Sequence, residues 1–162
     1  FGDVTLRKPK HDNHELLGKT KFSGCLGVMK DVKRNKYTQK ANIVADCSTD
    51  GKEVYKLKST ANTANWWYDH RISLIDAKTF ADYRTEYFKG GKHIKTIDRS
   101  WASANLDDPR ASYWGYWYGK TNTTGHETMA FIPSTITKVN HKYKKKNLWS
   151  TTTLKKMPKK IK

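Results

Sequence analysis

Two short stretches place a histidine beside a carboxylate and could support general acid–base chemistry. YDHR contains Asp69 and His70, and GHET contains His126 and Glu127. Histidine titrates near neutral pH, so two of them could act as acid and base in a secreted hydrolase, such as a ribonuclease or a glycan-cleaving enzyme. Neighbouring residues on a strand point to opposite faces, so neither histidine can pair with its adjacent carboxylate. The hypothesis therefore requires the fold to bring His70 and His126 together; structural or merely exposed histidines are the alternative.

Other catalytic and metal-binding patterns are absent from the sequence. It contains no nucleophile elbow, phosphate-binding loop, zinc-protease helix motif, EF-hand loop or dinucleotide-binding fingerprint. Asp107 and Asp108 are adjacent carboxylates, but a calcium site needs further oxygen ligands at a recognisable spacing. No cluster of cysteines and histidines has the spacing of a zinc site. We therefore expect no metal and no cofactor, and we favour a binding protein over an enzyme.

The stretch ASYWGYWY, residues 111–118, is unusual because five of its eight side chains are aromatic. If it is a strand, its side chains alternate between two faces. Tyr113 and Trp117 then share one face with Gly115, and the other face carries Trp114, Tyr116 and Tyr118. A half-buried strand needs only one apolar face. We predict that the first face packs in the core and that the second binds a partner; two buried faces are the alternative.

A second aromatic group precedes the apolar run HRISLIDA, and we expect a loop tip to display it. Together with the first group it gives these candidate binding residues: Trp66, Trp67, Tyr68, Trp114, Tyr116, Tyr118 and Lys120. Tyrosine and tryptophan combine an apolar ring with a polar group, which suits wet interfaces. Sugar rings, lipid head groups and single-stranded nucleic acid are the ligands that use such side chains.

The charge balance points to an anionic partner. The chain has 32 basic and 15 acidic residues and a formal net charge of +17. It contains 26 lysines and 6 arginines, and lysine suits diffuse attraction to a polyanion better than base-specific readout. We expect an anionic surface made of lipid, wall polymer or acidic glycan, with nucleic acid as a weaker alternative. A solvated basic surface without a partner is the other interpretation.

The two cysteines bear on the compartment in which the protein works. Cys25 and Cys47 lie on separate strand-like runs and belong to no CxxC motif. We predict that they form a disulfide worth about 3 kcal/mol by the loop-closure argument, with two buried free thiols as the alternative. The chain starts at Phe1 without a signal peptide or a run long enough to span a bilayer. These features predict a mature secreted, extracellular protein.

The pattern along the chain predicts an all-β fold. Short alternating runs are separated by turn signals, which include the dipeptides at 50–51 and 90–91. No long helical periodicity is present, although a short helix near 77–83 fits the pattern. We therefore predict an antiparallel sandwich or barrel that forms a single domain over residues 1–141.

The last part of the chain differs in composition from the rest. Residues 142–162 contain nine lysines and no acidic residue, which predicts either a basic interaction tail or a terminal strand. With the charge and the aromatic groups, this segment favours a secreted cationic module that docks on an anionic cell surface, as a toxin-like or antimicrobial protein would. The alternative function is the basic hydrolase that would use histidine acid–base chemistry.

Overall fold

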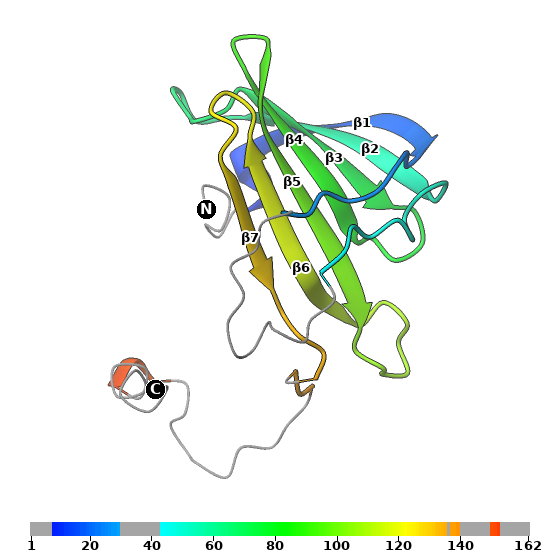
Figure 1. Cartoon of the computed structure of the whole chain (residues 1–162). Coiled ribbons are helices and arrows are strands. Elements are labelled where there is room, and N and C mark those ends of the chain that lie inside the picture. Colours follow the sequence, from blue (N-terminus) through cyan, green and yellow to red (C-terminus); the bar gives the residue numbers. More distant parts are fainter. Residues whose placement is uncertain (1–7, 30–42, 136, 140–149, 153–162) are drawn as a thin grey trace.

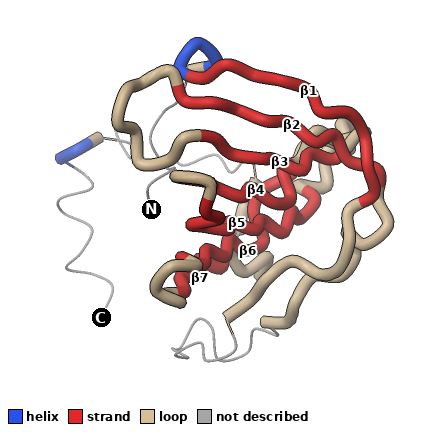
Figure 2. Tube along the Cα trace, turned by 90° about the horizontal axis from the view of Figure 1, so that it is seen from above, coloured by secondary structure: helices blue, strands red, loops and turns tan. Residues whose placement is uncertain are grey.

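Seven antiparallel strands form one sheet, in which the order of the strands follows the order of the chain. The computed structural model describes residues 8–29, 43–135, 137–139 and 150–152. Its elements are a 3-10 turn, η1 (Pro9–His11), and the strands β1 (Asp12–Lys21), β2 (Glu53–Ala61), β3 (His70–Asp76), β4 (Asp82–Lys89), β5 (Lys92–Ser103), β6 (Ser112–Thr121) and β7 (Glu127–Phe131). Figure 1 shows these strands side by side. Figure 2 shows β1 to β3 along their length and β6 and β7 closer to end-on, because the sheet twists strongly.

The predicted antiparallel all-β class is confirmed, and the described strands form an open sheet. β1 and β7 are its two edges, so the sheet does not close into a barrel. Among the described residues there is no second sheet that stacks on it as in a sandwich. The predicted turns are present: Gly51, Gly90 and Gly91 have φ angles of 75°, 55° and 71°, which a residue without Cβ adopts freely.

The sheet has two apolar faces, each with its own core. One cluster, on what we call the disulfide face, consists of Phe22, Leu26, Val54, Ala81, Tyr83, Tyr116 and Tyr118. The other, on the tryptophan face, consists of Tyr68, Tyr87, Ile97 and Trp117. Trp117 and Tyr118 are consecutive on β6, so the two clusters lie on opposite sides of the sheet. Within the described residues, loop side chains such as Leu26 and Tyr68 cover the two faces.

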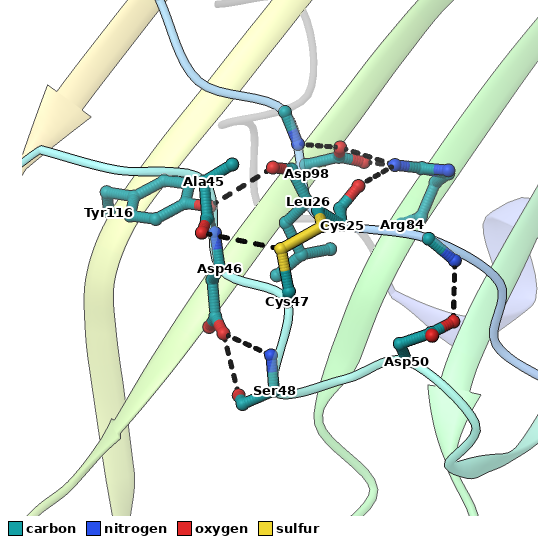
Figure 3. Close-up of a disulfide and its surroundings, with 12 residues drawn as sticks. Cys25, Leu26, Ala45, Asp46, Cys47, Ser48, Asp50, Arg84, Asp98 and Tyr116 are labelled. Carbon is teal, nitrogen blue, oxygen red and sulfur yellow. Dashed lines mark hydrogen bonds and ion pairs between the residues drawn. A yellow bond between two sulfur atoms is a disulfide. The ribbon is translucent and has the colours of Figure 1, made fainter.

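A disulfide holds together the two segments that cover the disulfide face. Cys25 and Cys47 are bonded across a sequence separation of 22 residues, as predicted. Figure 3 shows this bond with Arg84 from β4 and Asp98 from β5 close to it. The Asp98 carboxylate accepts hydrogen bonds from Arg84 Nε at 2.7 Å, Arg84 Nη2 at 2.8 Å and the Gly27 amide at 2.6 Å. Arg84 Nη2 also donates to the Cys25 carbonyl at 3.1 Å, so this group of bonds ties the disulfide segment to the sheet.

The predicted basic segment falls mostly outside the described residues. Of residues 142–162 the structure describes only 150–152, so the basic tail and the domain boundary after residue 141 stay predictions. Within the described part of the chain, no helix is long and apolar enough to cross a membrane.

Candidate functional site

A β-bulge at Gly115 decides which aromatic side chains of β6 share a face. In the pairing of β5 with β6, Ser100 lies opposite Tyr116 and Trp101 lies opposite Trp114. Gly115 is therefore an extra residue with no counterpart on β5. An extra residue shifts the alternation of side chains by one position. The side chains before Gly115 therefore lie on the opposite face from the one that strict alternation with residues 116–121 predicts.

Trp114 and Trp117 consequently lie on the same face, although strict alternation predicts opposite faces. Arg99 lies opposite Trp117 on β5, and its guanidinium carbon is 5.9 Å from the centroid of the Trp114 ring. Trp117 is 9% exposed and belongs to the core of the tryptophan face. Trp114 is 36% exposed and meets the Trp101 ring edge-on at 6.0 Å. Trp114 is thus the accessible tryptophan of β6.

The prediction that Tyr116 and Tyr118 line an exposed surface is wrong. They are 6% and 7% exposed and pack in the core of the disulfide face. The Tyr116 hydroxyl accepts a hydrogen bond from the Asp46 amide at 3.1 Å, and the Tyr118 hydroxyl donates one to Glu127 Oε1 at 2.6 Å. Burial raises the pKa of both phenols. Lys120 is exposed, as predicted for a surface lysine, and its Nζ lies 4.0 Å from Glu127 Oε1.

The segment 62–69, which precedes β3, folds over the tryptophan face instead of projecting from it. Tyr68 is 1% exposed, and its ring centroid lies 4.7 Å from that of Trp67. Tyr68 is therefore a core residue, and the prediction that it is displayed at a loop tip is wrong. Trp66 and Trp67 are half-buried, and Lys95 Nζ lies 5.6 Å from the centroid of the Trp67 ring.

The fold does not bring the two candidate catalytic histidines together. His70 lies on β3, where its ring stacks on Phe88 at 4.9 Å, and His93 stacks on Phe88 at 5.0 Å. His126 lies in the turn between β6 and β7, with its Nε2 3.3 Å from Thr128 Oγ1. β4 and β5 separate β3 from β6, which corresponds to roughly 14 Å across the sheet. Among the described residues, no group of three histidine, cysteine or acidic side chains could hold a metal ion.

An exposed aromatic and cationic surface lies on β1, β2 and the turn after β3, where the sequence analysis placed no site. We call it the Phe80 patch; it consists of Leu16, Lys19, Tyr55 and Phe80. Leu16 and Phe80 are 61% and 62% exposed. The Tyr55 and Phe80 rings are stacked with 6.5 Å between centroids and 4° between planes, and Lys19 Nζ lies 5.2 Å from the Tyr55 centroid. Leu16 pairs with Leu57, two residues from Tyr55, which places it on the same face.

The backbone at Phe80 is held in a conformation that is unfavourable for a bulky residue. Its φ angle is 61°, in the left-handed region, which costs a residue with a Cβ roughly 1–2 kcal/mol. Asp76 builds this turn, because its Oδ1 accepts hydrogen bonds from the amides of Lys78 and Thr79 at 2.9 and 2.7 Å. The short helix considered for 77–83 is therefore a turn leading into β4. An exposed aromatic residue in this costly conformation makes Phe80 a candidate functional residue.

Lys19 supplies the positive charge of the patch. Its Nζ donates a hydrogen bond to Glu53 Oε1 at 2.7 Å, and this bond together with the carboxylate charge raises the pKa of Lys19. Both side chains are at least half exposed, so the ion pair contributes little to stability and exchanges readily with other anions. The ammonium group therefore stays charged at neutral pH beside the apolar side chains of the patch.

Comparisons with known proteins bear on the fold. No protein-family model matches the chain, and no curated protein matches it. A solved structure described as an outer membrane lipoprotein-sorting protein domain from Vibrio parahaemolyticus superposes on it with a TM-score of 0.54 and 14% sequence identity. The superposition covers 82% of this chain and 47% of that chain, so this chain spans about half the length of its structural neighbour. At this identity the likeness shows a shared arrangement of the sheet.

Proposed function

We propose that the protein is a secreted cationic binding module that docks on an anionic cell surface through lysines and exposed aromatic side chains. The Phe80 patch is the observation that carries this proposal. It places exposed apolar and aromatic side chains beside a lysine, in a chain whose formal net charge is +17. Trp114 and the partly exposed Trp66 and Trp67 add further aromatic surface to the same face.

Anionic phospholipid is the surface that fits the chemistry of the patch best. Aromatic side chains with a polar group favour the depth of the lipid head groups, and exposed leucine and phenylalanine gain by leaving water. Each basic residue near an anionic membrane contributes about 1 kcal/mol of attraction. Wall polymer and acidic glycan would use the lysines but would gain less from Leu16 and Phe80.

A location outside the reducing cytoplasm is part of this proposal. The disulfide between Cys25 and Cys47 supports it, because such bonds persist in oxidising compartments. The description of the structural neighbour as an outer membrane lipoprotein-sorting domain is consistent with the same placement. The hydrolase alternative has less support. Its His70 lies on β3 and its His126 follows β6, and β4 and β5 lie between these two strands.

Binding to vesicles tests the proposal. We expect the protein to sediment with vesicles of phosphatidylcholine and phosphatidylglycerol but not with vesicles of phosphatidylcholine alone. Binding should weaken steeply between low and physiological salt, because exposed charges are screened beyond about 8–10 Å. Deleting residues 142–162 should weaken it further. Equal binding to both kinds of vesicle, or to purified wall polymer or RNA in preference to vesicles, would contradict the proposal.

Matched leucine variants test whether the patch itself makes the contact. Leu16→Ser removes an apolar side chain from the patch, whereas Leu106→Ser removes one that is 46% exposed in the loop after β5. We expect each of the single variants Leu16→Ser and Phe80→Asn to weaken vesicle binding about tenfold, equivalent to ~1.4 kcal/mol. Leu106→Ser should bind as the unmodified protein does. Release of a trapped dye from the vesicles would then show whether docking leads to toxin-like or antimicrobial damage.

A further inference from the structure

A pocket on the disulfide face lies apart from the Phe80 patch. It has a volume of about 150 Å³ and opens between residues 46–52, the turn 77–81, the end of β5 and the loop that leads to β6. This volume is about ten times the ~15 Å³ that one water molecule requires in the same measure. The pocket is therefore large enough for a small organic molecule the size of one ring with its substituents.

The lining of the pocket includes one negative side chain, Asp46, and one positive side chain, Lys52. Burial alone would raise the pKa of the Asp46 carboxyl, but hydrogen bonds from Ser100 and Ser48 outweigh it and hold the pKa below its ordinary value. Lys52 Nζ donates to the Tyr83 hydroxyl at 3.3 Å. An anionic ligand would meet the Asp46 carboxylate and a cationic ligand would meet the Lys52 ammonium. The two groups together favour a ligand without net charge that both donates and accepts hydrogen bonds.

The remaining walls of the pocket combine hydroxyl groups with an aromatic ring. Thr79, Tyr83 and Ser103 are lining residues that carry hydroxyl groups, and the Tyr83 hydroxyl already donates to Asp76 Oδ2 at 2.7 Å. Trp101 also lines the pocket, and because its indole Nε1 donates to the Asp82 carbonyl at 3.0 Å, its N–H group is not available to a ligand. A ligand that fits must therefore present several hydroxyl groups and one apolar face.

We propose that this pocket binds a single neutral pyranose sugar residue. A pyranose has hydroxyl groups around its rim, which match Asp46, Lys52 and the lining hydroxyls, and an apolar C–H face, which matches the Trp101 ring. The site goes beyond the docking function proposed above, because it recognises a neutral sugar and not a negative surface. The turn 77–81 lies between the two sites: Thr79 and Ala81 line the pocket, while Phe80 belongs to the patch on the other side.

Nuclear magnetic resonance titration of the full chain with single sugars tests the proposal. The probes are glucose, galactose, mannose and N-acetylglucosamine, with inorganic phosphate and glycine as anionic and zwitterionic probes. We expect at least one sugar to shift the amide signals of Ala102 and Ser103 in a saturable manner, and we expect neither of the other two probes to do so. Saturable shifts with phosphate or glycine alone, or no saturable shift with any sugar, would overturn the proposal.

Variants locate the binding within the pocket. Lys52→Gln should weaken sugar binding about tenfold by removing a charge-assisted hydrogen bond, whereas Lys56→Gln, on an exposed position of β2, should leave it unchanged. Ser103→Phe fills the pocket from an exposed position and should abolish binding with little effect on folding. Equal binding by Lys52→Gln and Lys56→Gln, or full binding by Ser103→Phe, would contradict the assignment. Vesicle binding by Ser103→Phe should be unchanged, so the sugar-binding proposal and the docking proposal can be refuted independently.

Discussion

Replacing Asp98 by asparagine, a change of one heavy atom, should strongly destabilise the protein. Asp98 is 1% exposed and accepts two hydrogen bonds from Arg84 and one from the Gly27 amide. An asparagine side chain at this position would keep one oxygen but would present an NH₂ group to a second donor. The Arg84 guanidinium, whose side chain is 22% exposed, would then lack its counter-charge.

The expected magnitude follows from that burial. Removing one partner of a buried ion pair costs about 3–5 kcal/mol, and the partial exposure of Arg84 places the cost near the lower value, about 3 kcal/mol. The double variant Arg84→Met with Asp98→Asn removes the unpaired guanidinium while the asparagine oxygen still accepts from the Gly27 amide. It should therefore recover at least ~1 kcal/mol relative to Asp98→Asn alone.

Urea unfolding followed by tryptophan fluorescence measures the free energy of unfolding of the single and the double variant. Thiol labelling after mild reduction measures how easily the disulfide is reduced. Because Asp98 ties the segment around Cys25 to the sheet, Asp98→Asn should also make the disulfide easier to reduce. The reasoning is refuted if Asp98→Asn costs less than ~1 kcal/mol, or if the double variant is less stable than the single one.

Three further predictions concern the aromatic and hydroxyl groups of the core. Trp117→Ala should lower the free energy of unfolding by about 3–5 kcal/mol because its ring is buried, whereas Trp114→Ala should cost only about 1 kcal/mol. Equal losses in urea unfolding would contradict the assignment of Trp117 to the core and of Trp114 to the surface. Burial, assisted by a hydrogen-bonded carboxylate, raises the folded-state pKa of Tyr83 and of Tyr118 above the unfolded value of about 10. The stability that comes from the neutral phenols of Tyr83 and Tyr118 is therefore complete below pH ~10 and is lost as the pH rises above it. The phenolate absorbance of these two tyrosines should appear together with unfolding. Reversible ionisation of every tyrosine in the folded protein would argue against this. Thr49 is 2% exposed, and its Oγ1 has no hydrogen-bond partner within the described residues. Thr49→Val should therefore leave the free energy of unfolding unchanged or raise it by up to ~1 kcal/mol. A loss of more than ~1 kcal/mol in thermal unfolding would show that the hydroxyl group has a partner.

Alternation and turn residues are local signals, and they predicted the all-β class and several of the turns. They did not predict every element, because Cys25 and Cys47, placed on strand-like runs, both lie in loops. The hairpin at Gly90 and Gly91 and the turn at Gly51 form where the dipeptides predicted them. The disulfide was also predictable, since two cysteines on neighbouring runs in a chain without a metal motif have few other roles. Each of these inferences uses residues close together in the sequence or a very small number of candidates.

The candidate site was less predictable because it depends on pairing between distant residues. The bulge at Gly115 arises from the register of β6 against β5, and one glycine in an aromatic run does not reveal it. Alternation therefore gave the correct strand but the wrong partners for Trp114. Tyr68 was misplaced for a similar reason, since its burial depends on Tyr87, which lies on another strand. The Phe80 patch had one usable signal, an aspartate at position 76 that favours a turn over a helix.

The open sheet leaves two edge strands, and their construction bears on self-association. An exposed edge offers unpaired amides and carbonyls to a strand from another molecule, which is a route to dimers and fibres. β7 is five residues long, and β1 is interrupted by a register shift between Leu16 and Lys19, with Gly18 at a φ angle of 112°. Lys19 and Lys21 add charged side chains to this edge, a common feature of edge strands that resist pairing. If copies gather at high density on a surface, pairing from edge to edge becomes more frequent, and the short β7 and the interrupted β1 limit the length of regular edge that the described strands offer to it.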